Sequence, residues 1–204
     1  MDGMLLVRGL LLGFSIAAPV GPIGVLVIRH SIASGRRAGL MTGLGAAAAD
    51  GLYGLAGGLG LSAVSTLLVD YALWLQLGGG AFLLWLGIRT LASPPESTEG
   101  DIVRSGHTRT FLTGLLLTLS NPLTMLSFAA MFAGLGVGVG TTGGGSVGWL
   151  VAGVFIGSAS WWLILSTTAS LARSRMTLER MRWVNRASGA LIAAFGVAAW
   201  IGAG

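Results

Sequence analysis

The chain of 204 residues is 53% hydrophobic and 9% charged, with a mean hydropathy of +0.83 and a formal net charge of +5. This composition excludes an ordinary soluble domain and is typical of a polytopic membrane protein. All 12 basic residues are arginines beside apolar segments, which indicates membrane orientation and not nucleic-acid binding. Cysteine is absent, which excludes disulfides, thiolate catalysis and cysteine-based metal sites.

The first apolar segment, about residues 4–28, is predicted to be a retained spanning helix and not a cleaved signal peptide. Proline has no N–H group, so Pro19 and Pro22 are expected to free the carbonyl groups of Ser15 and Ala18. Free carbonyls are tolerated at membrane depth only where protein or a wet cavity receives them. The pattern predicts either a binding break or a packing kink.

The second segment, about residues 38–61, carries the one acid of an otherwise uncharged run, Asp50. At helical rise this run crosses a bilayer with Asp50 near its middle. A carboxylate there costs roughly 2.5–3.5 kcal/mol on insertion scales unless it faces other helices, water or a cation. Asp50 therefore predicts a route for a substrate, an ion or a proton. The alternative is a carboxylate that only bonds a neighbouring helix.

The third segment covers about residues 71–91, and the polar stretch 93–108 that follows reads as a solvated cytoplasmic linker. This linker divides the chain into a first repeat, 1–92, and a second repeat, 109–204. Both belong to one membrane domain.

The fourth segment, about residues 110–135, has its own proline break. Pro122 is expected to free the carbonyl of Thr118, and Asn121 brings an amide into apolar surroundings. The glycine-rich loop 134–148 lacks the ending of a phosphate-binding loop, so nucleotide binding is not expected. The fifth and sixth segments cover about residues 149–171 and 187–201, and the sixth has room to begin before Arg186.

The arginines alternate between loops. The first, third and fifth loops carry them and the second and fourth do not, so the odd loops are predicted to be cytoplasmic and both termini outside. His30 and His107 fall in or beside loops, so no intramembrane histidine metal cluster is expected. The loop arginines are Arg29, Arg36 and Arg37, then Arg89, Arg104 and Arg109, then Arg173, Arg175, Arg180, Arg182 and Arg186.

The two halves of the chain resemble each other. Residues 8–22 match 109–122, and residues 79–87 match 188–196. A weaker match of 43–51 with 153–161 sets Ser160 opposite Asp50. Since each half has three spans, the halves must insert in opposite directions, as in transporters with a site at the repeat interface. The predicted fold is all-α: six transmembrane helices as two inverted three-helix repeats.

The motifs APVGPIG (18–24), ASGRRAGLMTGLGAAAADGLYGLAG (33–57) and LSNPLTM (119–125) resemble the lysine-exporter family of amino acid translocators (LysE/RhtB type) over essentially the full length. The family's usual motif is Pro-Gly-Pro, whereas this chain has one residue more, from Pro19 to Pro22. The resemblance implies export of amino acids or similar solutes from a bacterial cytoplasm, driven by an ion or proton gradient. By position, Asp50 matches the family's acid on the second helix.

We hypothesise that Asp50 and the two broken helices meet near the membrane centre. Asp50 would attract the substrate's ammonium group or hold a proton. The positive ends of the helix dipoles near Gly24 and Thr124 would favour the substrate's carboxylate. The candidate substrate-binding residues are Ser15, Ala18, Pro19, Gly21, Pro22, Thr118, Asn121, Pro122 and Ser160.

A divalent or heavy-metal cation exporter of the same superfamily is the alternative function, although it would want more hard ligands than the sequence supplies. No nucleophile–base–acid set lies in the apolar spans, so an enzyme is not expected, and neither a cofactor nor a resident metal is expected. The expected partners are an amino acid or analogue, the lipid bilayer and a coupling ion or proton. Stripes of small residues also allow a homodimer. The expected location is the bacterial cytoplasmic membrane.

Overall fold

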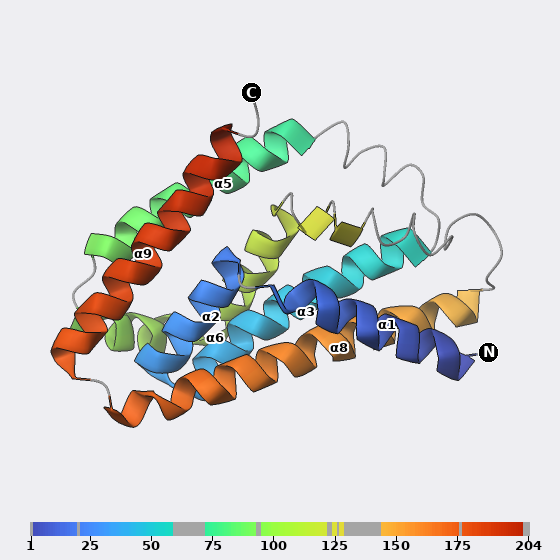
Figure 1. Ribbon diagram of the computed structural model, residues 1–204, viewed down its shortest axis with the longest axis horizontal. Helices are drawn as coiled ribbons and strands as arrows, with labels where there is room; N and C mark the ends of the chain where they lie inside the picture. Colours follow the sequence, from blue (N-terminus) through green and yellow to red (C-terminus); the bar gives the residue numbers. More distant parts are fainter. Residues whose placement is uncertain are drawn as a thin grey trace.

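The computed structural model is entirely helical in the part of the chain that it describes, so the all-α prediction is confirmed (Figure 1). The described residues are 2–19, 21–58, 72–92, 95–121, 124–125, 127–128, 144–175 and 177–201. The elements are α1 (Asp2–Ala17), α2 (Pro22–Ser34), α3 (Arg36–Gly58), α5 (Ala72–Ala92), α6 (Pro95–Leu119), α8 (Gly144–Leu171), the short 3-10 helix η1 (Arg173–Arg175) and α9 (Leu178–Ile201).

The first apolar segment forms two helices that meet at a sharp bend. The axes of α1 and α2 make an angle of 81°. Gly21 is extended, with φ −105° and ψ −166°, and Pro22 begins α2. Proline suits this first helical position, because its φ is fixed near the helical value and its missing N–H would have no helical partner there. The predicted interruption is therefore a change of direction.

Helix α2 continues through the loop that the sequence suggested after Ile28. It ends at Ser34, and the chain turns at Gly35 with φ +90°, a conformation that favours glycine. His30, which we expected in or beside a loop, is instead buried, with Nδ1 2.8 Å from Thr42 Oγ1 of α3. Arg29 is buried as well. The expectation was wrong because the first residue able to turn the chain is Gly35.

The polar stretch 93–108 also differs from the expected loop, because residues 95–105 are helical. Pro95 stands at the start of α6, and glutamates follow it within the first turns, where they favour a helix N-terminus. The helix is interrupted at Gly106, with φ +72° and ψ 162°. The expected loop at 62–70 and most of the glycine-rich loop 134–148 lie outside the described residues.

The helices pack in pairs. Helix α1 lies along α8, α3 lies between α6 and α8, and α5 lies along α9 (Figure 1). Glycines stand at the crossings: Gly9 and Gly13 of α1 face the backbone of α8, and Gly45 faces the backbone of α6 at Phe111. Without side chains at these points the helix backbones approach closely, as is common between membrane helices.

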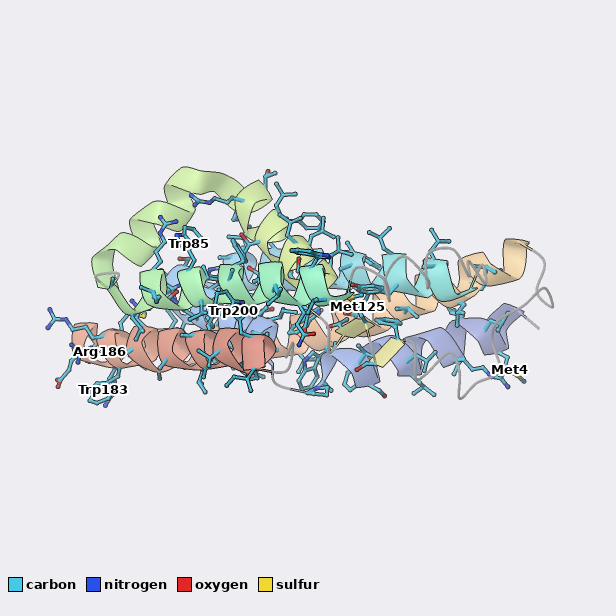
Figure 2. All side chains as sticks on the ribbon, turned by 90° about the horizontal axis from the view of Figure 1, so that it is seen from above. Met4, Trp85, Met125, Trp183, Arg186 and Trp200 are labelled. Carbon is cyan, nitrogen blue, oxygen red and sulfur yellow. The ribbon has the colours of Figure 1, made fainter. Side chains whose placement is uncertain are left out.

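The protein has an apolar exterior and a partly polar interior. Large apolar side chains are exposed along the helices, among them Trp85 of α5 and Trp200 of α9, each about half exposed (Figure 2). Threonine, serine, asparagine and aspartate side chains lie inside. By length and hydropathy, Val147–Leu171 and Glu179–Ile201 can each cross a membrane, and the bent pair α1–α2 can provide a third span. A membrane protein with several spans is thus supported, and six spans remain a prediction.

Candidate functional site

The carboxylate of Asp50 lies in the protein interior, where helix α8 holds it. Its side chain is 2% exposed, and Ser158 Oγ donates a hydrogen bond of 2.6 Å to Asp50 Oδ2. Trp162 Nε1, one turn further along α8, donates to the same Ser158 oxygen at 3.0 Å. The indole and the hydroxyl form a two-step chain that orients the carboxylate with neutral donors.

Asp50 lies near the middle of the contact between α3 and α8, which run antiparallel. Toward one end of this contact Gly43 lies against the Trp162 side chain, and toward the other Gly54 faces Val154. A side chain at Gly43 would collide with Trp162, so this glycine lets the indole approach α3 and reach Ser158. The small residues that the sequence sets beside Asp50 thus make room for its partners.

Tyr53, one turn beyond Asp50, connects this helix to the end of α6. Its hydroxyl donates a hydrogen bond of 2.8 Å to the carbonyl oxygen of Leu119, the last residue of α6. Its ring stacks on Phe128 at a centroid distance of 5.4 Å. The carbonyls at a helix C-terminus have no partner within the helix, so the tyrosine caps the second break from α3.

At the first break, the candidate residues differ in burial. Ser15 and Pro19 are exposed, Ala18 and Gly21 are partly buried, and Pro22 is buried. The N–H of Ala18 still bonds the carbonyl of Phe14 at 3.0 Å. A Cβ atom built on Gly21 would meet no atom within 4 Å, so there is open space beside the bend.

At the second break, the helix tightens before it ends. We expected the carbonyl of Thr118 to be left without a partner. Instead, it accepts a hydrogen bond of 3.1 Å from the N–H of Asn121. The last turn has closed with a 3-10 type bond, which is common at helix ends. The carbonyl of Asn121 accepts the N–H of Met125 at 3.2 Å. Pro122 itself lies outside the described residues.

Two apolar clusters bring residues of both breaks close to Asp50. One contains Ala17 and Ile23, which flank the first break, together with Ala46 and Ala47, one turn before Asp50. The other contains Tyr53, one turn after Asp50, and packs against residues of the second break. The acid therefore lies on the stretch of α3 that both clusters border. The partners in this second cluster are Phe128 and Val154, with Leu12, Ile16, Leu119 and Met125 against them.

Ser160, the residue that the repeat match set opposite Asp50, is not its hydrogen-bond partner. Its hydroxyl donates to the carbonyl of Ile156 in its own helix at 2.7 Å. Ser158 holds the carboxylate instead, two residues earlier and thus on a different side of α8. The repeat match gives equivalent positions and not contacts, because helices in contact are paired by their crossing geometry.

Comparison with known proteins identifies the family. The family described as "LysE type translocator" matches residues 14–202. The chain belongs to the LysE-type translocator family. No solved structure matches it.

Three relatives of this LysE-type translocator illustrate the family. An uncharacterized membrane protein of Escherichia coli K12, YahN, is 34% identical, over 83% of this chain and 77% of the relative. A putative amino acid efflux protein of Bacillus subtilis 168, YcgF, is 31% identical, over 92% of this chain and 90% of the relative. The threonine efflux protein of Escherichia coli K12 is 27% identical, over 87% of this chain and 88% of the relative. The chain is thus a membrane translocator and not an enzyme.

Sequence reasoning found the acid of this translocator but missed Tyr53, Ser158 and Trp162. A signal for two of them was present, since an indole N–H and a phenol hydroxyl at membrane depth need partners. Tyr53 also stands three residues after Asp50, on the same face of the helix. Nothing in the sequence distinguished Ser158 from Ser160.

Proposed function

We propose that this protein exports amino acids or closely related small solutes from the bacterial cytoplasm, using a site around Asp50. The observation that carries the proposal is a buried carboxylate close to both helix breaks, held by a neutral hydroxyl donor. A carboxylate in the membrane interior is costly and commonly marks a substrate or proton route. The printed names of two relatives, a threonine efflux protein and a putative amino acid efflux protein, agree with this function.

Asp50 attracts the substrate's ammonium group or carries the coupling proton in this proposal. Ser158 occupies Oδ2, and Oδ1 is left to meet the ligand. The start of α2 at Pro22 presents the positive end of a helix dipole, which favours the substrate's carboxylate. The carbonyl oxygen of Thr118 already accepts the N–H of Asn121. It can bind the substrate's ammonium group only through its second lone pair.

The glycine contacts between α5 and α9 support an inverted repeat. In the match of 79–87 with 188–196, Gly80 is equivalent to Gly189, and Gly87 is equivalent to Gly196. A Cβ on Gly80 would lie 3.1 Å from the carbonyl oxygen of Gly196, and one on Gly87 would lie 2.8 Å from that of Gly189. If each residue is replaced by its equivalent in the other repeat, the contact of Gly80 with Gly196 becomes the contact of Gly189 with Gly87. A two-fold axis between oppositely inserted halves requires this exchange.

The backbone bonds at the two breaks support the same relation. Gly21 precedes Pro22, and its carbonyl accepts the N–H of Val25 at 3.1 Å. Asn121 precedes Pro122 in the sequence, and its carbonyl accepts the N–H four residues on, from Met125. Equivalent positions thus open a new helical turn in both halves, which suits a site shared between them.

The first and fifth connections lie together at one end of the protein, which supports cytoplasmic odd loops. The turn at Gly35 lies beside Arg173 of η1, since a Cβ there would be 2.9 Å from Arg173 Nη1. Trp183 and Arg186 project from this end, which we call the arginine end, and Met4 lies at the other (Figure 2). The positive-inside rule then sets the arginine end in the cytoplasm.

Cation export, the alternative function, gains no support from the described residues, which hold no group of three or more histidine, cysteine, aspartate or glutamate side chains able to bind a metal. Hard cations prefer several oxygen ligands around one site.

The test is uptake of radiolabelled threonine by inverted membrane vesicles, where export appears as uptake, with and without a proton gradient. Asp50→Asn is expected to lower the rate by about tenfold or more, the effect of losing a charge-assisted bond, at unchanged membrane levels. Glu179→Gln, an exposed carboxylate on α9, is the matched control and is expected to transport normally. Full activity of Asp50→Asn would remove the carboxylate from the mechanism. No transport of threonine or any other amino acid would refute the proposed function.

A further inference from the structure

A buried guanidinium joins three helices at the arginine end. Arg29 of α2 is 7% exposed. Its Nε donates to Asn185 Oδ1 of α9 at 3.1 Å, and its Nη1 donates to Thr90 Oγ1 of α5 at 3.2 Å. Both acceptors are 1% exposed and uncharged. Arg29 is thus a cation enclosed between α2, α5 and α9 and held by neutral oxygens.

The charges around Arg29 call for an anion. Arg89, next to Thr90 in the sequence, is near enough to repel the Arg29 charge. Two carboxylates have side chains that the structure describes, and neither offsets the Arg29 charge, because Asp50 is bonded to Ser158 and Glu179 is exposed. Burying a charge costs several kcal/mol unless an opposite charge and hydrogen bonds offset it. The observed bonds use the Nε N–H and one of the two Nη1 N–H groups, which leaves the other Nη1 N–H and both Nη2 N–H groups for an oxygen anion.

We propose that Arg29 binds the carboxylate of the amino acid substrate at an entry site, before the substrate reaches Asp50. The inference rests on the proposed function and adds a second site to it. His30, the next residue, contacts Thr42, and Thr42 precedes Asp50 by eight residues on α3, which is about 12 Å along the helix. One α-amino acid cannot bridge that length between its ammonium and α-carboxylate groups. Arg29 and Asp50 therefore act in succession.

A guanidinium suits this role because its planar fork binds a carboxylate through two parallel hydrogen bonds. A lipid phosphate would use the same fork, but it would have to enter from the bilayer. The enclosure of Arg29 by α5 and α9 disfavours that route. The substrate, in contrast, comes from the cytoplasm at the arginine end.

The experiment measures equilibrium binding of threonine and threoninamide to the purified full chain in lipid nanodiscs. Threoninamide keeps the ammonium group and lacks the carboxylate. Arg29→Gln is expected to weaken threonine binding by about tenfold to a hundredfold, the range for a hydrogen bond to a charged group, and to leave threoninamide binding unchanged. Arg29→Lys keeps the charge without the planar fork, so its affinity for threonine is expected to lie between those of the unaltered protein and Arg29→Gln. Arg182→Gln, an exposed arginine on α9, removes the same charge from the same end and is expected to bind both ligands normally.

The outcomes separate the two proposals. Equal loss of threonine and threoninamide binding in Arg29→Gln would overturn the entry site, since the arginine would then serve structure alone. If the effect of Arg29→Gln on threonine binding disappears in nanodiscs without anionic lipid, Arg29 binds an anionic lipid headgroup, and the entry site is overturned as well. Asp50→Asn is expected to weaken both ligands because it acts on the ammonium group. Failure of the unaltered protein to bind threonine or any other amino acid would overturn the proposed function and, with it, the entry site.

Discussion

The hydroxyl of Tyr53 bonds the carbonyl oxygen of Leu119, and this bond ties the helix that carries Asp50 to the end of α6. Leu119 is the last residue of α6 before the second break, and Tyr53 stands one turn after the acid. One hydrogen bond and the stacking of Tyr53 on Phe128 therefore connect the second break to α3.

Removing that hydroxyl is expected to loosen the bend without opening a cavity. Tyr53→Phe keeps the ring stack and leaves the Leu119 carbonyl without its partner, which costs about 1–3 kcal/mol. We expect a lower melting temperature in detergent and slower threonine export. Phe128→Leu, which keeps the hydrogen bond and weakens the stack, is the comparison. If Tyr53→Phe melts and transports as the unaltered protein does, the bond does not hold the bend.

Ser158 and Ser160 give opposite predictions. Ser158→Ala removes the donor to Asp50 and the acceptor of the Trp162 N–H, so export is expected to fall by about tenfold. Ser160→Ala removes only a hydroxyl that bonds its own helix, so export is expected to change little. Transport rates at matched membrane levels decide between them. Greater loss in Ser160→Ala would restore the residue that the repeat match suggested.

The comparison of these two serines shows what the sequence could reveal. An acid in an apolar run and a proline in each half can be read directly from the sequence. Both are informative because they are costly in lipid. Which serine meets Asp50 depends on how α3 and α8 cross, and no local pattern records that. The interior position of Asp50 was thus predictable from the sequence, and its partners were not.

Arg29 and His30 show a second limit. Charge beside an apolar segment suggested a loop, but α2 continues to Ser34 and carries both residues into the interior. Their partners, Asn185, Thr90 and Thr42, come from three other helices. Tertiary contacts therefore decided the burial of a charge that sequence patterning assigned to the surface.

The glycines of α5 offer a test of the close packing with α9. A Cβ on Gly87 would lie 2.6 Å from the backbone nitrogen of Ala193, whereas one on Gly78 would meet nothing within 4 Å. Gly87→Ala is expected to force the helices apart and to cost about 1–3 kcal/mol, the usual range for overpacking. Gly78→Ala is expected to be neutral or slightly stabilising, since alanine is the better helix former. Thermal unfolding in detergent measures both, and equal melting temperatures would contradict the packing of α5 on α9.

The orientation of the protein can be tested directly because the chain has no cysteine. Gly3 near the N-terminus and Ser174 in η1 are both exposed, so single cysteines there are accessible to a thiol reagent. With cytoplasmic odd loops, a membrane-impermeant maleimide is expected to label Gly3→Cys in intact spheroplasts and Ser174→Cys only after the membrane is permeabilised. Labelling in denaturant provides the control for total thiol. Labelling of Ser174→Cys in intact spheroplasts, with protection of Gly3→Cys, would reverse the proposed direction of the protein. The arginine end, with Arg29, would then face the outside, where it could not receive a substrate from the cytoplasm.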